Sequence, residues 1–201
     1  MPRQAVTRRE VLNQSARLFA THGYKATSLA LVSERLGVTR QALYYHFKSK
    51  GAILAALFDE LMTKLEAAVG EVEITAAGER FEALLRAHLT VCANNIDLLA
   101  LLMHERPEIA KIEGLRANKR RREYSEGLTA AYDEGVSAGV LSDVDSWVAV
   151  NAALSAANGI SLWFHGARAQ RMSTATLVDL LVGMLASGYA TSGRPFVAGA
   201  E

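Results

Sequence analysis

Cysteine and proline are scarce in this chain of 201 residues, which contains one cysteine and three prolines. Cys92 has no second cysteine with which to form an intramolecular disulfide or a zinc cluster, so we expect a reducing compartment, no metal and no cofactor. Runs of β-branched residues are also rare, whereas alanine and leucine, which favour helices, are frequent. The composition therefore predicts an all-α fold.

Long hydrophobic runs are absent as well. Apolar runs such as Leu98–Met103 fall far short of the roughly 18 to 20 residues that a membrane-spanning helix requires. No apolar segment with a small-residue cleavage site follows the charged start, Met1–Glu10, so no secretory signal is visible. We expect a cytoplasmic, nucleoid-associated protein with no membrane partner.

The sequence also lacks the motifs of common catalytic sites. No G-x-G-x-x-G, P-loop, H-E-x-x-H, G-x-S-x-G or C-x-x-C pattern occurs, and His104-Glu105 has no second histidine at the spacing of a zinc protease. We therefore expect that the protein is not an enzyme and has no catalytic residues.

What the chain does have is a marked division of charge. Residues 1–50 contain 9 Lys and Arg against 2 Asp and Glu (+7), whereas residues 51–201 contain 13 against 19 (−6), which together give the net charge of +1. This division favours a polyanion-binding head attached to a body with another role. On charge alone, a merely solvated basic face is the simpler alternative.

Periodicity and capping residues divide the basic block into helices. An amphipathic helix is predicted over residues 7–21, and a second helix starts at a Thr27 or Ser28 cap and is closed by Gly37. Further helices are predicted over residues 40–47, capped by Thr39, and from Lys50 towards Val69, capped by Ser49. Two short helices separated by Gly37-Val38-Thr39 are typical of a helix-turn-helix.

The second helix of this motif is the expected reader of DNA. Leu43 and Phe47 lie four residues apart and are assigned to the core. Its other residues combine base-edge donors, phosphate donors and aromatic faces. They are Arg40, Gln41, Tyr44, Tyr45, His46 and, just beyond it, Lys50.

The residues from Thr27-Ser28-Leu29 through Leu36-Gly37-Val38-Thr39-Arg40-Gln41-Ala42-Leu43-Tyr44-Tyr45-His46-Phe47-Lys48-Ser49-Lys50 resemble the DNA-binding domain of the TetR family of bacterial transcriptional regulators. The resemblance covers roughly the first quarter of the chain. It implies that phosphates are held by Thr27, Tyr45 and Lys50, and that the major groove is faced by Thr39, Arg40, Gln41, Ala42, Tyr44 and His46. Ser28 completes the expected DNA-binding set. Gly51 departs from the acidic residue that similar sequences often carry there, which affects only the local cap.

The remainder reads as helices with short breaks. They are predicted over residues 80–94, 96–104 (ended near Pro107), 114–138, 143–166 and 173–191, after a linker at 70–78. The family resemblance implies a DNA-binding domain at 1–50, a connecting helix at 51–70 and a ligand-binding and dimerisation domain at 71–201.

Small residues mark an expected dimer interface on the last two helices, because they allow another backbone to approach closely. One face carries Val148, Ala152, Ser155, Gly159 and Trp163, and the last helix adds Gly183, Ala186, Ser187 and Ala190 beside Leu177, Leu181 and Met184. Tight packing within one subunit is the alternative.

A second face of the 143–166 helix predicts a ligand site, since its two asparagines need hydrogen-bond partners if they are buried. This face carries Trp147, Asn151, Leu154, Asn158 and Leu162. Facing helices would add Phe81, Leu85, His88, Leu89, Cys92, Leu99, Leu102, Met103, Tyr124 and Leu128. Ordinary core packing is the alternative for most of these side chains.

The run Lys119-Arg120-Arg121-Arg122 is usually a solvated face. Together with Trp163-Phe164-His165, however, it is similar in layout to TetR-type regulators of lipid and steroid breakdown that bind acyl-CoA thioesters. That weaker resemblance implies that Arg120, Arg121 and Trp163 contact the ligand. Multidrug, flavonoid and other hydrophobic effectors remain open.

The two halves together predict a homodimer that binds a palindromic double-stranded DNA operator and is released by a small hydrophobic effector, with an acyl-CoA thioester as one candidate. A transcriptional activator of the same fold, and a helical hydrophobic-ligand carrier without regulatory DNA binding, are the alternatives.

Overall fold

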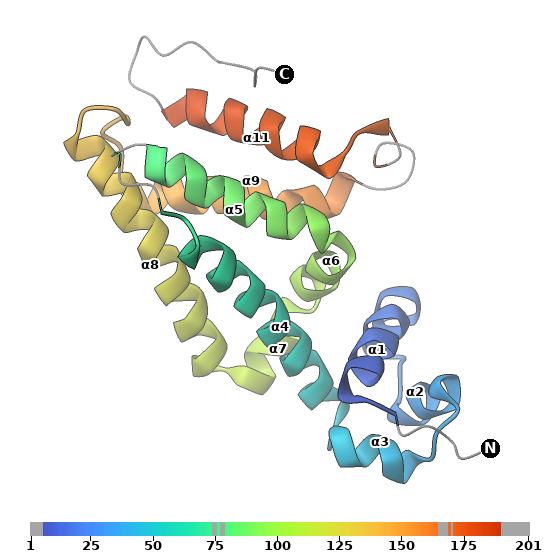
Figure 1. Cartoon of the computed structure of the whole chain (residues 1–201). Helices are drawn as coiled ribbons and strands as arrows, with labels where there is room; N and C mark the ends of the chain where they lie inside the picture. Colours follow the sequence, from blue (N-terminus) through green and yellow to red (C-terminus); the bar gives the residue numbers. More distant parts are fainter. Residues whose placement is uncertain (1–5, 74–75, 77–78, 165–168, 170, 190–201) are drawn as a thin grey trace. The chain divides into compact units, whose positions relative to one another are not determined.

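The computed structural model describes residues 6–73, 76, 79–164, 169 and 171–189 of the chain. Figure 1 shows the described part as helices joined by short connections. They are α1 (Arg8–His22), α2 (Leu29–Leu36), α3 (Arg40–His46), α4 (Lys50–Gly70), α5 (Glu79–Asn94), α6 (Ile96–His104), α7 (Arg106–Glu113), α8 (Leu115–Ser137), α9 (Ser146–Trp163) and α11 (Thr174–Tyr189). The predicted all-α fold is confirmed. Within the described ranges, no helix has both the length and the apolar character needed to cross a bilayer.

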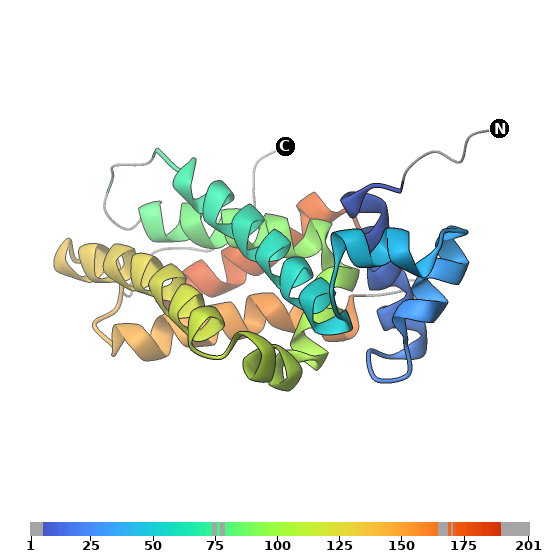
Figure 2. The same ribbon diagram turned by 90° about the horizontal axis from the view of Figure 1, so that it is seen from below.

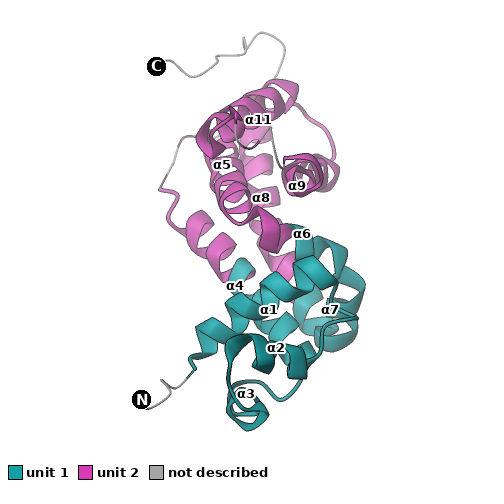
Figure 3. Ribbon diagram, turned by 90° about the vertical axis from the view of Figure 1, so that its right-hand side faces the viewer, with its two compact units in different colours: residues 1–61, 100–118 teal, residues 62–99, 119–201 magenta. Residues whose placement is uncertain are grey.

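The chain is divided into two compact units, as Figure 3 shows. The first contains residues 1–61 and 100–118, and the second contains residues 62–99 and 119–201. Helices α4, α6 and α8 each begin in one unit and end in the other. The first unit therefore extends beyond the basic block and includes all of α7. The functional division at residues 50 and 70 remains a prediction.

The head of the first unit is formed by α1, α2 and α3, which contact one another. Thr7 and Glu10 form a capping box at the start of α1, with the Glu10 backbone N–H donating to Thr7 Oγ1 at 3.2 Å. Gly37 adopts a left-handed conformation after α2 (φ 65°), which lets its N–H satisfy carbonyl groups at the end of that helix. Leu43 and Phe47 are buried, as predicted.

Residues 100–118 join the first unit through specific contacts. Arg116, in the first turn of α8, forms an ion pair with Asp59 on α4 at 2.6 Å. On α7, Ile109 is buried, and the side chain of Ile112 approaches Gly51 so closely that a Cβ added there would lie 3.2 Å from its Cδ1. Gly51, the departure noted in the sequence, thus sits where α7 approaches α4.

In the second unit, α5 packs against both α11 and α9, an arrangement that Figure 2 shows from below. Phe81, Tyr132 and Tyr189 form an edge-to-face aromatic cluster here, with ring centroids 5.1 to 6.0 Å apart. Such contacts add to the apolar burial that holds the helices together.

Several predicted boundaries were wrong. Pro107 was expected only to follow the end of the 96–104 helix. It lies instead in the first turn of a separate helix, α7, where its missing N–H has no cost. Helix α9 starts at Ser146, because the side chain of Asp145 accepts a hydrogen bond from Val148 N at 2.9 Å. Parts of other predictions lie outside the described residues: most of the 74–78 stretch of the linker, His165 and Gly166, and Ala190 and Thr191.

Candidate functional site

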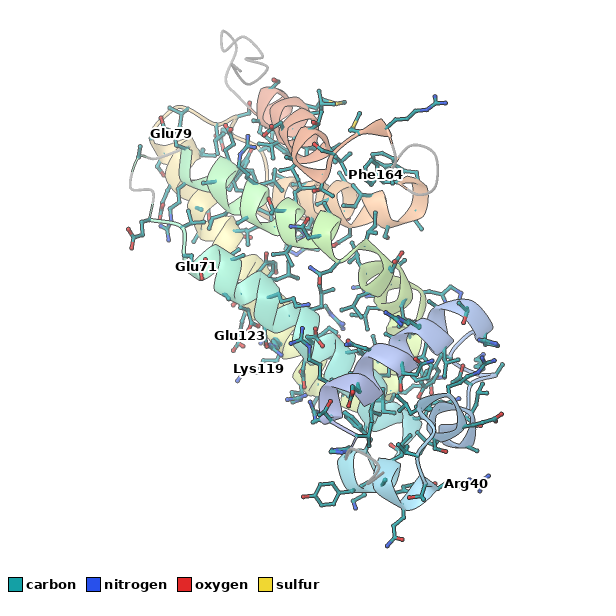
Figure 4. The ribbon with its side chains drawn as sticks, turned by 45° about the vertical axis from the view of Figure 1, so that its right-hand side comes forward. Arg40, Glu71, Glu79, Lys119, Glu123 and Phe164 are labelled. Carbon is teal, nitrogen blue, oxygen red and sulfur yellow. The ribbon has the colours of Figure 1, made fainter. Side chains whose placement is uncertain are left out.

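Helix α3 presents a polar surface on the side opposite the buried residues Leu43 and Phe47. Thr39, Arg40 and Gln41 are exposed, and Thr39 caps the helix by accepting a hydrogen bond from Ala42 N at 3.2 Å. Figure 4 labels Arg40 on this helix. A guanidinium and an amide side by side on a short exposed helix can donate to guanine and pair with adenine in a major groove.

The aromatic residues of α3 differ in accessibility. Tyr45 is 82% exposed, and Tyr44 is also exposed, whereas His46 and Ala42 are half-buried. The ring of His46 is held by the backbone, since its Nε2 lies 2.7 Å from the carbonyl oxygen of Val6. Tyr44 and Tyr45 are therefore accessible to a partner surface, while His46 also anchors Val6, the residue before the Thr7 cap of α1.

The Thr27 side chain, expected to hold a phosphate, has its hydrogen-bond partners within the head. It is almost fully buried, and its hydroxyl donates to the carbonyl oxygens of Gly23 at 2.8 Å and Leu18 at 3.3 Å. The hydroxyl therefore ties the loop to α1 rather than facing a phosphate. The exposed cap of α2 is Ser28, whose Oγ accepts from Leu31 N at 3.2 Å.

Lys50 also has intramolecular partners that the sequence did not predict. Its ammonium donates to the carbonyl oxygens of Tyr24 at 2.7 Å and Lys25 at 3.1 Å, and it lies 4.4 Å from the centroid of the Tyr24 ring. A lysine at the start of α4 therefore needs no phosphate to compensate its charge, because the turn after α1 already does so.

Sequence reasoning overlooked other basic side chains of the head. The Arg8 guanidinium lies 4.6 Å from the centroid of the Phe47 ring, at the C-terminal end of α3. Its position directly after the Thr7 cap could have indicated this. Further exposed basic residues of the head are Arg9, Arg17, Lys25, Arg35 and Lys48. Basic side chains of this kind can attract phosphates without regard to base sequence.

In the second unit, a polar cluster lies among apolar side chains of α5, α8 and α9. Nδ1 of His88 is 2.8 Å from the Tyr124 hydroxyl, and its Nε2 is 3.4 Å from Sγ of Cys92. The Cys92 thiol donates to Oδ1 of Asn158 at 3.7 Å. One tautomer satisfies this chain: Tyr124 donates to Nδ1, and Nε2–H donates to the sulfur.

Burial sets the protonation of this polar cluster. It lowers the pKa of His88 to about 4, although a hydrogen bond with Asn158 opposes that shift. It raises the pKa of the Cys92 thiol to about 12, and it raises the pKa of Tyr124 as well. At neutral pH the cluster is therefore uncharged, and Cys92 is an unreactive thiol.

The other residues predicted to line the ligand site differ in burial and in the unit to which they belong. Phe81, Leu85, Leu89, Leu99 and Leu128 are buried in the second unit, and Leu154 is half-buried there. Leu102 and Met103 belong to the first unit.

Three predicted ligand residues of α9 face outward instead. Trp147 is 68% exposed and Leu162 is 81% exposed, and Trp163 is exposed too. The buried face of the helix carries small and branched residues instead: Ala149, Val150, Ala153, Ala157 and Ile160. The prediction of an inward face for Trp147 and Leu162 was wrong, because periodicity locates the faces of a helix but does not say which one is covered.

Two other polar residues predicted to bind the ligand also have hydrogen-bond partners within the chain. Nδ2 of Asn151 donates to the Trp147 carbonyl oxygen in its own helix at 2.8 Å, so it does not require a ligand. The Arg120 guanidinium donates to both carboxylate oxygens of Glu66 at 2.6 Å and to Thr63 Oγ1 at 2.9 Å. Arg121 is half-buried. On the same helix, Lys119 and Glu123 form an exposed pair (Figure 4).

Comparison with known proteins covers both parts of the chain. Residues 11–57 match the family model "Bacterial regulatory proteins, tetR family", and residues 75–188 match "Tetracyclin repressor-like, C-terminal domain". The HTH-type transcriptional regulator AcrR of Shigella flexneri is 40% identical over 68 residues, which are 34% of this chain and 30% of AcrR. The match thus spans under a third of that relative's length.

Solved structures resemble the chain over most of its length. A transcriptional regulator of the TetR/AcrR family from Thermobifida fusca is 34% identical, with a TM-score of 0.66 over 92% of this chain and 98% of that one. AibR, solved in complex with isovaleryl coenzyme A and operator DNA, is 25% identical, with a TM-score of 0.73 over 88% of this chain and 96% of that one. With its helix-turn-helix head and both family models matched, the chain belongs to the tetR family of bacterial regulatory proteins, which are DNA-binding regulators and not enzymes.

Proposed function

We propose that the chain is a homodimeric transcriptional repressor that binds a palindromic operator and leaves it when a small hydrophobic effector binds. The single observation that carries DNA binding is the surface of α3, where Arg40, Gln41 and Tyr45 are exposed while Leu43 and Phe47 hold the helix in the head. Two such helices on a two-fold axis would enter successive major grooves.

Exposed apolar residues on α9 and α11 support the dimer. Val148 and Trp163 are exposed on the small-residue face of α9, and Met184 is exposed on α11. Soluble monomers seldom leave several large apolar side chains together in water. A second copy that covers this surface would form an isologous interface, as two-fold dimers do.

The effector is proposed to bind in the second unit, where the cluster of His88, Tyr124, Cys92 and Asn158 offers polar groups among apolar ones. AibR supports an acyl-CoA thioester as the candidate effector. Since Arg120 already pairs with Glu66, coenzyme A phosphates would have to replace that carboxylate at Arg120. The domain division at residues 50 and 70 belongs to the same proposal.

A thermal-shift screen of the purified chain tests the effector. It would compare acyl-CoA thioesters of several lengths with the matching free acids, with coenzyme A alone and with a panel of aromatic and cationic drugs. A ligand at a hundredfold excess over its Kd stabilises the native state by about 2.7 kcal/mol, which moves the midpoint by several degrees. A shift with thioesters alone supports the proposal, and the same thioester should then release the chain from operator DNA. No shift with any thioester, for a folded dimer, would contradict that effector class.

A further inference from the structure

A groove of about 400 Å³ lies within the first unit. One wall is formed by residues 22–26, the turn after α1, and the other by residues 104, 105, 107, 108 and 111 at the junction of α6 and α7. All of these belong to the unit shown in teal in Figure 3. The groove is thus built from elements other than the DNA-facing α3 and the polar cluster of the second unit.

A nearly buried carboxylate faces this groove. Glu105 is 8% exposed, and its Oε1 lies 3.0 Å from Nδ1 of His104, a side chain that is 84% exposed and charged only when protonated. Among the described residues, no lysine or arginine forms an ion pair with Glu105. A buried carboxylate is costly unless a cation or several donors compensate it.

Tyr24, a mostly buried side chain whose hydroxyl has no hydrogen-bond partner in the described part of the chain, also lines the groove. Tyr24 is 6% exposed, and within the described ranges its hydroxyl makes no hydrogen bond. Burial raises the pKa of Tyr24, and the charges of Glu108 and Glu105 raise it further, which places the phenol near both carboxylates. The ring itself is fixed by the Lys50 ammonium at 4.4 Å from its centroid.

The other charged groups of the groove are exposed or already paired. The Lys111 ammonium donates to Glu108 at 3.0 Å, and Lys25 and His22 are exposed at the rim. The mostly buried charge of the groove that has no lysine or arginine partner among the residues described is therefore negative, on Glu105. A metal ion is not the expected occupant, because no three His, Cys, Asp or Glu side chains of the described part are grouped so as to hold one.

We propose that this groove binds a small organic cation that carries a primary ammonium group. The ammonium, with its three donors, bonds the Glu105 carboxylate and the Tyr24 hydroxyl oxygen. Its carbon chain lies along Ala26 and Pro107, which also line the groove. Such a ligand bridges the turn before α2 and the start of α7, and it thereby stabilises the first unit. The site does not depend on the effector proposed for the second unit.

Isothermal titration calorimetry of the full chain with 1,4-diaminobutane tests this proposal, with 1,4-butanediol as the uncharged analogue of the same length. The expected result is saturable binding of the diamine at one site per chain and no binding of the diol. Glu105→Gln keeps the shape and removes the charge, and it should weaken diamine binding about tenfold or more. Tyr24→Phe should weaken it by a smaller factor, because it removes only a neutral acceptor.

Glu34→Gln is the matched control, because it removes the same charge from an exposed position on α2 of the same unit. It should leave diamine binding unchanged. Backbone amide shifts of Gly23 and Lys25 in the unaltered chain, followed during the titration, locate the ligand independently of any variant. The proposal is overturned if the diamine does not bind, if Glu105→Gln binds it as tightly as the unaltered chain, or if those two amides do not respond.

Discussion

Lys50 makes several contacts within the head. Its ammonium donates to two carbonyl oxygens in the turn after α1 and lies over the Tyr24 ring. The side chain thereby joins the start of α4 to the turn that precedes α2. Its first role in the structure is to hold the helix-turn-helix in place.

Replacement of Lys50 by methionine should therefore lower stability. The two carbonyl groups lose a charged donor, so we expect the free energy of unfolding to fall by about 1 to 3 kcal/mol, measured by urea denaturation. Lys48→Met, an exposed lysine two residues earlier, is the matched control and should change it by less than about 0.5 kcal/mol. Equal effects of the two substitutions would show that the observed bonds do not stabilise the head.

His88 makes stability depend on pH. Its pKa is about 4 in the folded chain, below its ordinary value of 6.5, so the unfolded chain binds the proton more readily between these values. The free energy of unfolding should be greatest above pH 6.5 and fall as the pH falls towards 4, by up to about 1.4 kcal/mol per pH unit. His88→Gln, compared with the unaltered chain at pH 7 and pH 5, should remove that part of the loss. Parallel pH profiles would contradict a buried, neutral His88.

At the scale of the helix, end signals located most elements of the head. The predicted caps Thr39 and Ser49 and the closing glycine Gly37 each lie next to a helix end in the structure. These signals are local, since they depend on bonds between residues three or four apart. The apolar residues that recur at helical spacing along α4 are also buried: Ile53, Leu54, Leu57, Phe58, Leu61 and Leu65.

Long-range features could not be found in this way. Periodicity in the sequence distinguishes two faces of α9, but the prediction that Trp147 and Leu162 face the interior was wrong. Only packing against α5 decides which face is covered. The partners of Thr27, Lys50 and Arg120 lie 4 to 57 residues away and compete with the roles inferred for those side chains. Likewise, the groove beside Tyr24 joins segments about 80 residues apart, which no local pattern connects.

At the start of α9, the Asp145 cap can be compared with a nearby aspartate that makes no cap. Asp145 accepts a bond from Val148 N, whereas Asp143 lies before the helix and is exposed. Asp145→Ala should lower the free energy of unfolding by about 1 kcal/mol, and Asp143→Ala should change it by no more than a few tenths. Thermal melts of both variants check this. A larger effect of Asp143→Ala would contradict the assignment of Asp145 as the cap.

At the scale of the whole molecule, the proposed regulator depends on a dimer. Ala152 is exposed on the small-residue face of α9, beside Val148. A glutamate there would place two like charges across the proposed two-fold axis, where buried charges without partners are strongly unfavourable. Ala152→Glu should therefore shift the chain to monomers in sedimentation velocity.

The same substitution at Ala130, an exposed position on α8, serves as the control and should leave the assembly unchanged. A dimer that persists in Ala152→Glu would show that another surface forms the interface. One head alone binds a half-site weakly, and two heads joined in a dimer bind a palindromic operator more tightly. The monomeric variant should therefore also lose affinity for such an operator.

The central claim, that α3 reads DNA sequence, is tested most directly by selection from a randomised duplex library with the unaltered chain and with Arg40→Ala. The account predicts that the unaltered chain enriches a two-fold symmetric site. Arg40→Ala should relax the preference at one position of each half-site, at a cost of about 1 to 3 kcal/mol, and leave the other positions recognisable. Failure to enrich any site, or an identical site from Arg40→Ala, would contradict the assignment of α3 as the reading helix.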